Sequence, residues 1–158
     1  TALIMTGAVG IGPIEEIVQA LAEDVQLLVI CGRNQKLFNR LTKLNLGNVK
    51  IYPLIDYVDE LMSASDVVLT KAGGLTISES LAKGLPMIFF SSIPGLETSN
   101  EKVICKSGAG IKVKTVEEIK NNLFFLKSNS YAYQDIKQKV IRLKKADTLK
   151  DLSVEILS

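Results

Sequence analysis

The sequence predicts an α/β domain built on a parallel sheet with helices on both of its faces. Short apolar runs alternate with helical patterns along the whole chain. Most of these runs are continuously apolar and rich in β-branched residues, as strands covered on both faces should be. Repeated strand–helix units of this length imply parallel strands joined by right-handed crossovers, which is a Rossmann-like arrangement. The chain has 158 residues, so we expect one domain over residues 1–158.

The elements follow one another in a regular order. Strands are predicted at residues 2–5, 25–31, 49–52, 66–70, 86–90 and 110–113. The first helix starts at Pro13, a residue type favoured at the first helical position, and Glu15 and Glu16 complement its dipole. Further helices are predicted at residues 34–43, 58–64, 75–83, 99–106, 116–126 and 132–145.

Composition excludes several classes of protein. The chain is 47% hydrophobic and 23% charged, which excludes intrinsic disorder. A net charge of +2 is too small to indicate a nucleic-acid partner, so none is expected. Histidine is absent, which removes the commonest general base and the commonest zinc ligand. Cys31 ends an apolar run and is expected to be buried, in a protein of the reducing cytoplasm.

The beginning of the chain also carries an expectation. It opens in an apolar run, without a start methionine and without the basic flank of a signal peptide. No stretch reaches the ~18–20 apolar residues of a membrane-spanning helix. We therefore expect a piece that begins in the middle of a longer protein and does not cross a bilayer.

In a sheet of this kind ligands bind beyond the carboxyl ends of the strands, so the loops after strands are the candidate sites. The first such loop contains Gly7, Gly10 and Gly12 before a helix start, where an anion is favoured. Its spacing matches neither a dinucleotide fingerprint nor a Walker A loop, and it is equally consistent with a tight turn. After the second strand, Arg33 would stack on a base or bind a phosphate, unless it is an ordinary exposed arginine before an Asn34 helix cap.

Two later loops are richer in polar groups. In the first, Gly73 and Gly74 precede a helix in which Thr76 offers phosphate ligands and Glu79 suits a ribose diol. Thr76 and Glu79 are equally consistent with a capping box. In the second, the side chains after the Pro94–Gly95 turn would read sugar hydroxyls, or Thr98 or Ser99 simply caps the next helix. These loops contain no nucleophile–base pair and no metal cluster, so they favour a nucleotide-linked ligand.

The order of these motifs resembles the donor half of lipid glycosyltransferases with a GT-B fold. The resemblance is carried by the segments at residues 70–79, 84–86 and 94–100, together with the first glycine loop, residues 31–34 and residues 59–66. The similar families are the bacterial processive diacylglycerol glucosyltransferases and the plant monogalactosyldiacylglycerol synthases. The peptidoglycan transferase that makes lipid II is a more distant relative. The resemblance runs from residue 1 to about residue 113.

The resemblance implies a C-terminal, UDP-sugar-binding domain of an enzyme that moves glucose or galactose from UDP to a lipid, diacylglycerol in the similar families. The N-terminal acceptor domain, which is absent from this chain, would carry the acceptor site and the general base; the catalytic residues of this chain are therefore unknown. No cofactor or metal is expected. By this resemblance the diphosphate binds at Gly7, Gly10, Gly74, Leu75 and Thr76, the uridine at Arg33, Leu54, Ile55 and Glu79, and the hexose at Glu97 and Asn100.

Departures from the family pattern leave alternatives open. Leu96 stands where the family often has glutamine, and Val9 stands where it often has a polar residue.

The alternatives are a separate donor-binding subunit of a two-chain UDP-GlcNAc transferase and a UDP-GlcNAc 2-epimerase-like domain. We expect a cytoplasmic protein, with a peripheral position on the inner face of the membrane as a further option. The basic helix near residues 134–145 would rest on anionic lipid in that case, or else form a solvated face.

Overall fold

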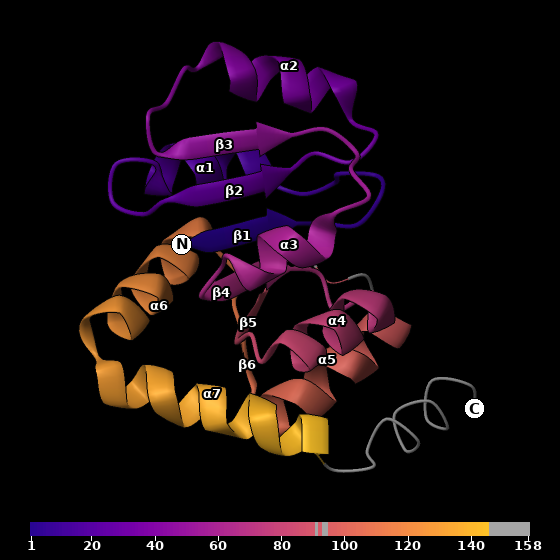
Figure 1. Ribbon diagram of the computed structural model, residues 1–158, viewed down its shortest axis with the longest axis vertical. Coiled ribbons are helices and arrows are strands. Elements are labelled where there is room, and N and C mark those ends of the chain that lie inside the picture. Colours follow the sequence, from indigo (N-terminus) through magenta and orange to yellow (C-terminus); the bar gives the residue numbers. More distant parts are fainter. Residues whose placement is uncertain (91, 93–94, 146–158) are drawn as a thin grey trace.

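The computed structural model describes residues 1–90, 92 and 95–145, and it confirms the predicted fold class (Figure 1). Its sheet has six parallel strands in the order β3-β2-β1-β4-β5-β6. The strands are β1 (Ala2–Met5), β2 (Leu27–Ile30), β3 (Val49–Tyr52), β4 (Val67–Thr70), β5 (Met87–Phe89) and β6 (Gly110–Lys112). The chain runs outward from β1 to β3 and then returns to place β4 beside β1, so the topological switch point lies between β1 and β4.

Helices cover both faces of the sheet (Figure 1). They are α1 (Ile14–Leu21), α2 (Gln35–Lys43), α3 (Val58–Ser63), α4 (Gly74–Lys83), α5 (Leu96–Lys106), α6 (Val116–Ser128) and α7 (Ser130–Lys145). The apolar residues of α1, α2 and α6 pack on one face, and those of α3, α4 and α5 pack on the other. Helix α7 contributes to both clusters, through Ile136 and Val140 respectively.

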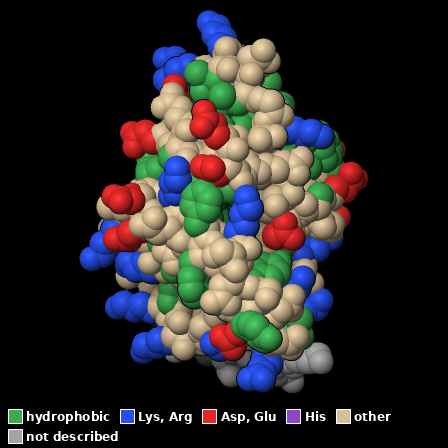
Figure 2. All heavy atoms as spheres, turned by 90° about the vertical axis from the view of Figure 1, so that its left-hand side faces the viewer, with side chains coloured by type: hydrophobic (Ala, Val, Ile, Leu, Met, Phe, Trp, Pro, Cys, Tyr) green, Lys and Arg blue, Asp and Glu red, His purple; other side chains and the backbone are tan. Residues whose placement is uncertain are grey.

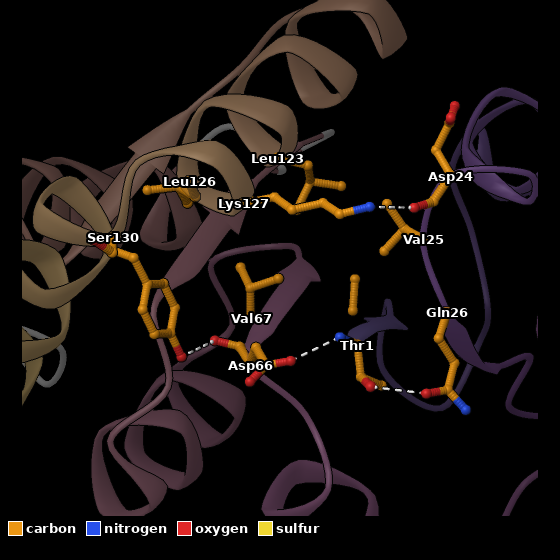
Figure 3. A pocket seen from close by; sticks show the side chains of 12 residues that line it. Thr1, Asp24, Val25, Gln26, Asp66, Val67, Leu123, Leu126, Lys127 and Ser130 are labelled. Carbon is orange, nitrogen blue, oxygen red and sulfur yellow. Dashed lines mark hydrogen bonds and ion pairs between the residues drawn. The ribbon is translucent and has the colours of Figure 1, made fainter.

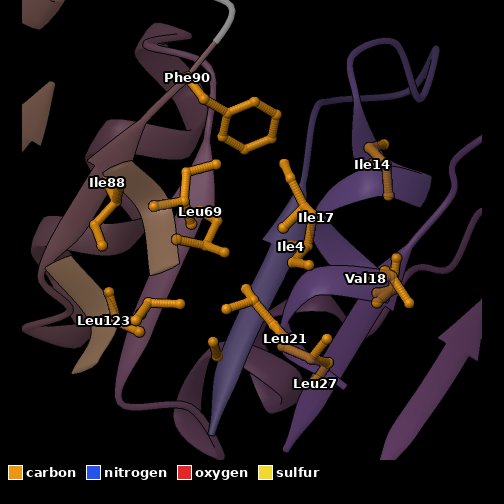
Figure 4. Packing of buried hydrophobic residues seen from close by; sticks show 14 of the residues in the cluster. Ile4, Ile14, Ile17, Val18, Leu21, Leu27, Leu69, Ile88, Phe90 and Leu123 are labelled. Atoms are coloured by element: carbon orange, nitrogen blue, oxygen red, sulfur yellow. The ribbon is translucent and has the colours of Figure 1, made fainter. Parts of the chain in front are cut away.

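Alternation along the strands divides the core in two. Ile4 belongs to one cluster, whereas its neighbours Leu3 and Met5 belong to the other. Figure 4 shows the first cluster, in which α1 packs over β1 and β4. Every residue of β1 and β4 is buried, which explains why these segments read as continuous apolar runs rather than as alternating ones.

The start of α5 differs from the sequence prediction. This helix was expected at residue 99 but begins at Leu96. Gly95 has a positive φ of 106° and turns the chain, and its carbonyl accepts the N–H groups of Thr98 and Ser99. Gly95, whose positive φ a glycine adopts easily, therefore sets the start of α5 before the polar residues that were expected to start it. The expectation that Thr98 or Ser99 caps this helix is wrong, because both lie inside its first turn.

The register of the sheet brings the candidate loops together. Met5 pairs with Thr70 at the carboxyl ends of β1 and β4, so the β1–α1 loop and the β4–α4 loop leave the sheet side by side. The loops after β2, β3 and β5 leave from the same edge, because all strands are parallel. Within the described residues, no helix is both long enough and apolar enough to cross a membrane.

Candidate functional site

Two hydrogen bonds hold the β1–α1 loop, residues 6–13, against the start of α2. Arg33 donates its backbone N–H to the carbonyl of Ala8 at 2.8 Å, and the Asn34 side-chain amide donates to the carbonyl of Gly10 at 2.9 Å. Gly10 has a φ of +61°, and a Cβ on it would lie 2.1 Å from the Cys31 carbonyl oxygen. Only glycine fits this position, since both the backbone conformation and the space exclude a side chain.

Gly7 differs from Gly10 in what surrounds it. Its φ is also positive, at +74°, but a Cβ there would meet no atom within 4 Å. Because Gly7 has no side chain, open space remains beside its exposed backbone. Gly10 serves the packing of the loop, as the tight-turn interpretation requires, whereas Gly7 leaves room for a ligand beside its backbone.

Thr6 lies at the base of this loop, one residue beyond β1. Its side chain is buried, and its hydroxyl has no hydrogen-bond partner in the part of the chain that the structure describes. Buried hydroxyls usually have a partner, so this one marks an incomplete polar environment at the switch point. Above it, Val9 and Ile11 flank Gly10 and are each 61% exposed.

The second and third loops place the predicted uridine residues at the same edge. Asn34 caps α2, because its Oδ1 accepts the N–H of Leu37 at 3.0 Å. Arg33, one residue earlier, is exposed. In the β3–α3 loop Leu54 is 50% exposed, and Ile55 is half-buried against the cluster on the α4 face. The structure therefore gathers these residues at one edge of the sheet, with Arg33 and Leu54 turned to solvent.

Helix α4 begins without a side-chain cap. Its N-cap residue is Gly73, with extended backbone, and no side chain among the described residues caps the helix. Gly74, Leu75 and Thr76 form the first turn, so their N–H groups have no partner within the helix. The capping-box interpretation of Thr76 and Glu79 is wrong, because Thr76 lies inside the helix.

The loop before α4 and the start of α5, which are distant in sequence, are joined in the structure. The Asn100 side-chain amide donates to the carbonyl of Ala72 at 3.1 Å, and Asn100 is only 5% exposed. Lys71 Nζ lies 3.4 Å from Glu97 Oε1, and both side chains are about one-fifth exposed. Two contacts thus fix the N-terminal part of α5 to the loop before α4. Lys71 is not among the site residues predicted from the sequence, where its only signal is its place one residue after a predicted strand.

A hollow in the described part of the chain lies elsewhere. It has a volume of about 350 Å³ and sits at the opposite edge of the sheet, where β1 and β4 begin. Leu123, Leu126 and Val67 contribute its apolar wall (Figure 3). Tyr133 also lines it and donates its hydroxyl to the Asp66 carbonyl at 3.1 Å. Figure 2 shows this side of the molecule, on which Lys, Arg, Asp and Glu side chains are scattered rather than gathered by sign. No residue predicted to bind the donor lines this hollow.

Titratable groups add little to the candidate site. Burial raises the pKa of the Cys31 thiol to about 11, so this thiol stays protonated at neutral pH beneath the glycine loop. The described residues contain no group of three or more Cys, Asp or Glu side chains placed to hold a metal ion. The chemistry available at the carboxyl edge is therefore that of backbone N–H groups, one helix start, an exposed arginine and carboxylates.

Comparison with known proteins decides the family. The model of the glycosyltransferase family 28 C-terminal domain matches residues 11–152 of the chain. The chain belongs to this family. A probable monogalactosyldiacylglycerol synthase of Nicotiana tabacum is 38% identical to this family 28 domain over 130 residues, which cover 75% of the chain and 24% of the relative. The processive diacylglycerol beta-glucosyltransferase of Bacillus subtilis (strain 168) is 32% identical over 161 residues, which cover 98% of the chain and 42% of the relative.

A solved structure gives the same fold. WaaG, a glycosyltransferase involved in lipopolysaccharide biosynthesis, matches 98% of this family 28 domain and 45% of its own chain, with a TM-score of 0.74 at 19% identity. The fold is thus that of one half of a GT-B glycosyltransferase. The chain spans between about a quarter and two fifths of the length of the two relatives described above.

Proposed function

We propose that this family 28 domain binds a UDP-hexose and belongs to an enzyme that transfers glucose or galactose to a lipid acceptor, diacylglycerol. One relative is named as a monogalactosyldiacylglycerol synthase and the other as a diacylglycerol beta-glucosyltransferase, which supports this acceptor and these donors. Those names also favour lipid glycosylation over a two-chain UDP-GlcNAc transferase and over a 2-epimerase.

The observation that carries the proposal is that the two segments proposed to bind phosphate lie side by side at the switch point. The β1–α1 glycine loop and the uncapped start of α4 leave the sheet from paired positions, Met5 and Thr70. Free N–H groups and the helix dipole at such a place favour an anion. A UDP-hexose whose diphosphate binds at this point would extend along the edge in two directions. Its uridine would point toward the loops after β2 and β3, and its hexose would point toward α5.

The residues of the proposed donor site fall into three groups, one for each part of the UDP-hexose. We assign the diphosphate to Gly7, to the loop that Gly10 packs in place, and to Gly74, Leu75 and Thr76; the uridine to Arg33, Leu54, Ile55 and Glu79; and the hexose to Glu97 and Asn100. Glu79 lies in the second turn of α4, half-buried and one turn beyond the proposed diphosphate, where its carboxylate would accept hydrogen bonds from the ribose diol. The amide of Asn100 is already bonded to Ala72, so its contribution to the hexose falls to its oxygen or to the loop that it fixes.

The proposed mechanism is a displacement at the anomeric carbon. An acceptor hydroxyl oxygen bonds to that carbon while the bond to the β-phosphate oxygen breaks, and UDP leaves with the bonding electrons. The N–H groups at the start of α4 and the helix dipole stabilise the negative charge that builds on UDP, and we assign this role to no metal. The proton of the acceptor hydroxyl goes to a base that we place outside this domain.

The acceptor implies a position at a membrane surface, and we propose a peripheral one on the inner, cytoplasmic face. We do not assign that contact to α7. Lys139 pairs with Asp135, Lys144 donates to the carbonyl of Ala82, and Lys137 lies over the ring of Tyr133. Three lysines of this helix thus have partners within the molecule, as on an ordinary solvated face.

Isothermal titration calorimetry of the 158-residue chain tests the proposal. We expect binding of UDP, UDP-glucose or UDP-galactose, and no binding of inorganic phosphate at the same concentration. A parallel assay with diacylglycerol vesicles should detect no hexose transfer by this chain alone. Absence of UDP binding would contradict the proposed donor site, and transfer by the chain alone would contradict the assignment of the base to another domain.

A further inference from the structure

We propose that Lys71 is a positioning residue that holds the Glu97 carboxylate in place for the donor hexose and shields it from the diphosphate. The proposal rests on the function proposed above and adds to it the residue that makes the hexose contact possible. Lys71 and Glu97 lie 26 positions apart in the sequence, and the structure brings them together at the carboxyl edge of β4.

The geometry places the pair between the two proposed halves of the donor site. Lys71 directly follows Thr70, the last residue of β4, and lies two residues before Gly73, the N-cap of α4. Glu97 is the second residue of α5. The ammonium group therefore stands on the loop that leads to the proposed diphosphate site, while the carboxylate stands on the helix proposed to meet the hexose.

Electrostatics explains why such a pair is needed. A carboxylate beside a diphosphate is repelled by it, and the repulsion is strong where both charges are partly shielded from water. The Lys71 and Glu97 side chains are 18% and 19% exposed, so solvent screens them less than it screens a surface pair. The ammonium, 3.4 Å from Glu97 Oε1, offsets the charge of that carboxylate.

A second contact, beside the ion pair, holds the loop of Lys71 against the helix of Glu97. The buried amide of Asn100 donates to the carbonyl of Ala72, the residue next to Lys71. Asn100 lies three residues after Glu97, on the same helix. The loop and the helix are therefore fixed to each other by a neutral hydrogen bond immediately beside the ion pair, which keeps the backbone of Lys71 close to α5.

The proposal predicts that Lys71 acts only through Glu97, which a double-mutant cycle tests. The variants are Lys71→Met, Glu97→Gln and their combination, titrated with UDP and with whichever of UDP-glucose and UDP-galactose the wild type binds more tightly. We expect Lys71→Met to lower the affinity for the UDP-hexose about tenfold, because it removes the ammonium group that offsets the charge of Glu97 beside the proposed diphosphate. In the Glu97→Gln background the same substitution should change the affinity for either ligand less than about twofold.

The charge-matched control is Lys102→Met, an exposed lysine on the same helix α5, which should change neither affinity. Equal losses of UDP affinity from Lys71→Met in both backgrounds would overturn the proposal, because Lys71 would then contact the diphosphate itself. An unchanged UDP-hexose affinity in Lys71→Met would overturn it as well. A wild-type chain that binds no UDP would instead overturn the proposed function, and the inference with it.

Discussion

At the scale of single residues, Gly7 and Gly10 show how one sequence pattern serves two purposes. Both have positive φ, yet only Gly10 lies so close to another loop that a methyl group would overlap the Cys31 carbonyl. The sequence predicted the glycine loop but left open whether it is a tight turn or a ligand cradle. The structure assigns the packing role to Gly10 and leaves open space at Gly7.

Alanine substitutions separate these two roles. Gly7→Ala should lower the free energy of unfolding by about 1–2 kcal/mol, because its cost is confined to the left-handed backbone. Gly10→Ala should lose about 1–3 kcal/mol more, because the new methyl group also has to displace the second loop. Urea denaturation followed by circular dichroism measures both, with Gly47→Ala as the control at an open position without positive φ. Equal losses for Gly7→Ala and Gly10→Ala would contradict the packing role.

Glu79 carries a prediction about binding alone. Because it takes no part in a cap, Glu79→Ala should leave the melting temperature nearly unchanged while weakening UDP binding by about 1–3 kcal/mol, the cost of a lost charged hydrogen-bond pair. Calorimetric titration with UDP measures the affinity. The matched control is Glu117→Ala, an exposed glutamate in the first turn of α6. Unchanged UDP affinity in Glu79→Ala would remove this residue from the proposed uridine site.

Contacts between loops are the part of the site that the sequence alone does not predict. Residue types and spacing indicated Glu97 and Asn100 as polar groups near a helix start. Whether Asn100 faces a ligand or a neighbouring carbonyl depends on how α5 packs against the β4–α4 loop, which is a long-range contact. The pairing of Lys71 with Glu97 has the same origin, because no local pattern connects residues 26 positions apart.

At the scale of elements, the pattern Thr-x-x-Glu occurs at two helix starts with different outcomes. At α6, Thr115 is the N-cap and accepts the N–H of Glu118 at 3.1 Å, while Glu118 accepts the N–H of Lys114 at 2.7 Å. At α4 the same pattern lies inside the helix, because the N-cap residue is Gly73 and not Thr76. A glycine pair before the threonine is the local signal that distinguishes the two cases.

This difference predicts opposite consequences for two threonines. Thr115→Ala should lower the free energy of unfolding by about 1 kcal/mol, because it removes a helix cap. Thr76→Ala should stay within about 0.5 kcal/mol of the wild type in stability and lower the affinity for UDP about three- to tenfold. Thermal denaturation and titration with UDP provide both readouts. A loss of stability in Thr76→Ala as large as that in Thr115→Ala would restore the capping interpretation of α4.

At the scale of the whole molecule, the parallel α/β fold was predictable because strands covered on both faces leave continuous apolar runs. Those runs located the six strands to within about two residues. The same pattern does not predict which side chains cross between loops, nor the hollow at the opposite edge, whose walls come from α6, α7 and the strand starts. The two edges of the sheet thus differ: one gathers the predicted donor residues, and the other holds this hollow.

The central claim is that the donor nucleotide binds at the carboxyl edge, at the switch point between β1 and β4. Backbone amide NMR of the 158-residue chain, recorded during titration with UDP, tests it most directly. The largest shifts are predicted for the amides at the proposed diphosphate site: Gly7, Gly10, Gly74, Leu75 and Thr76. Shifts confined to the hollow lined by Val25, Leu123 and Tyr133 at the opposite edge, or no shifts at a UDP concentration of about 1 mM, in the weak-binding range, would contradict it.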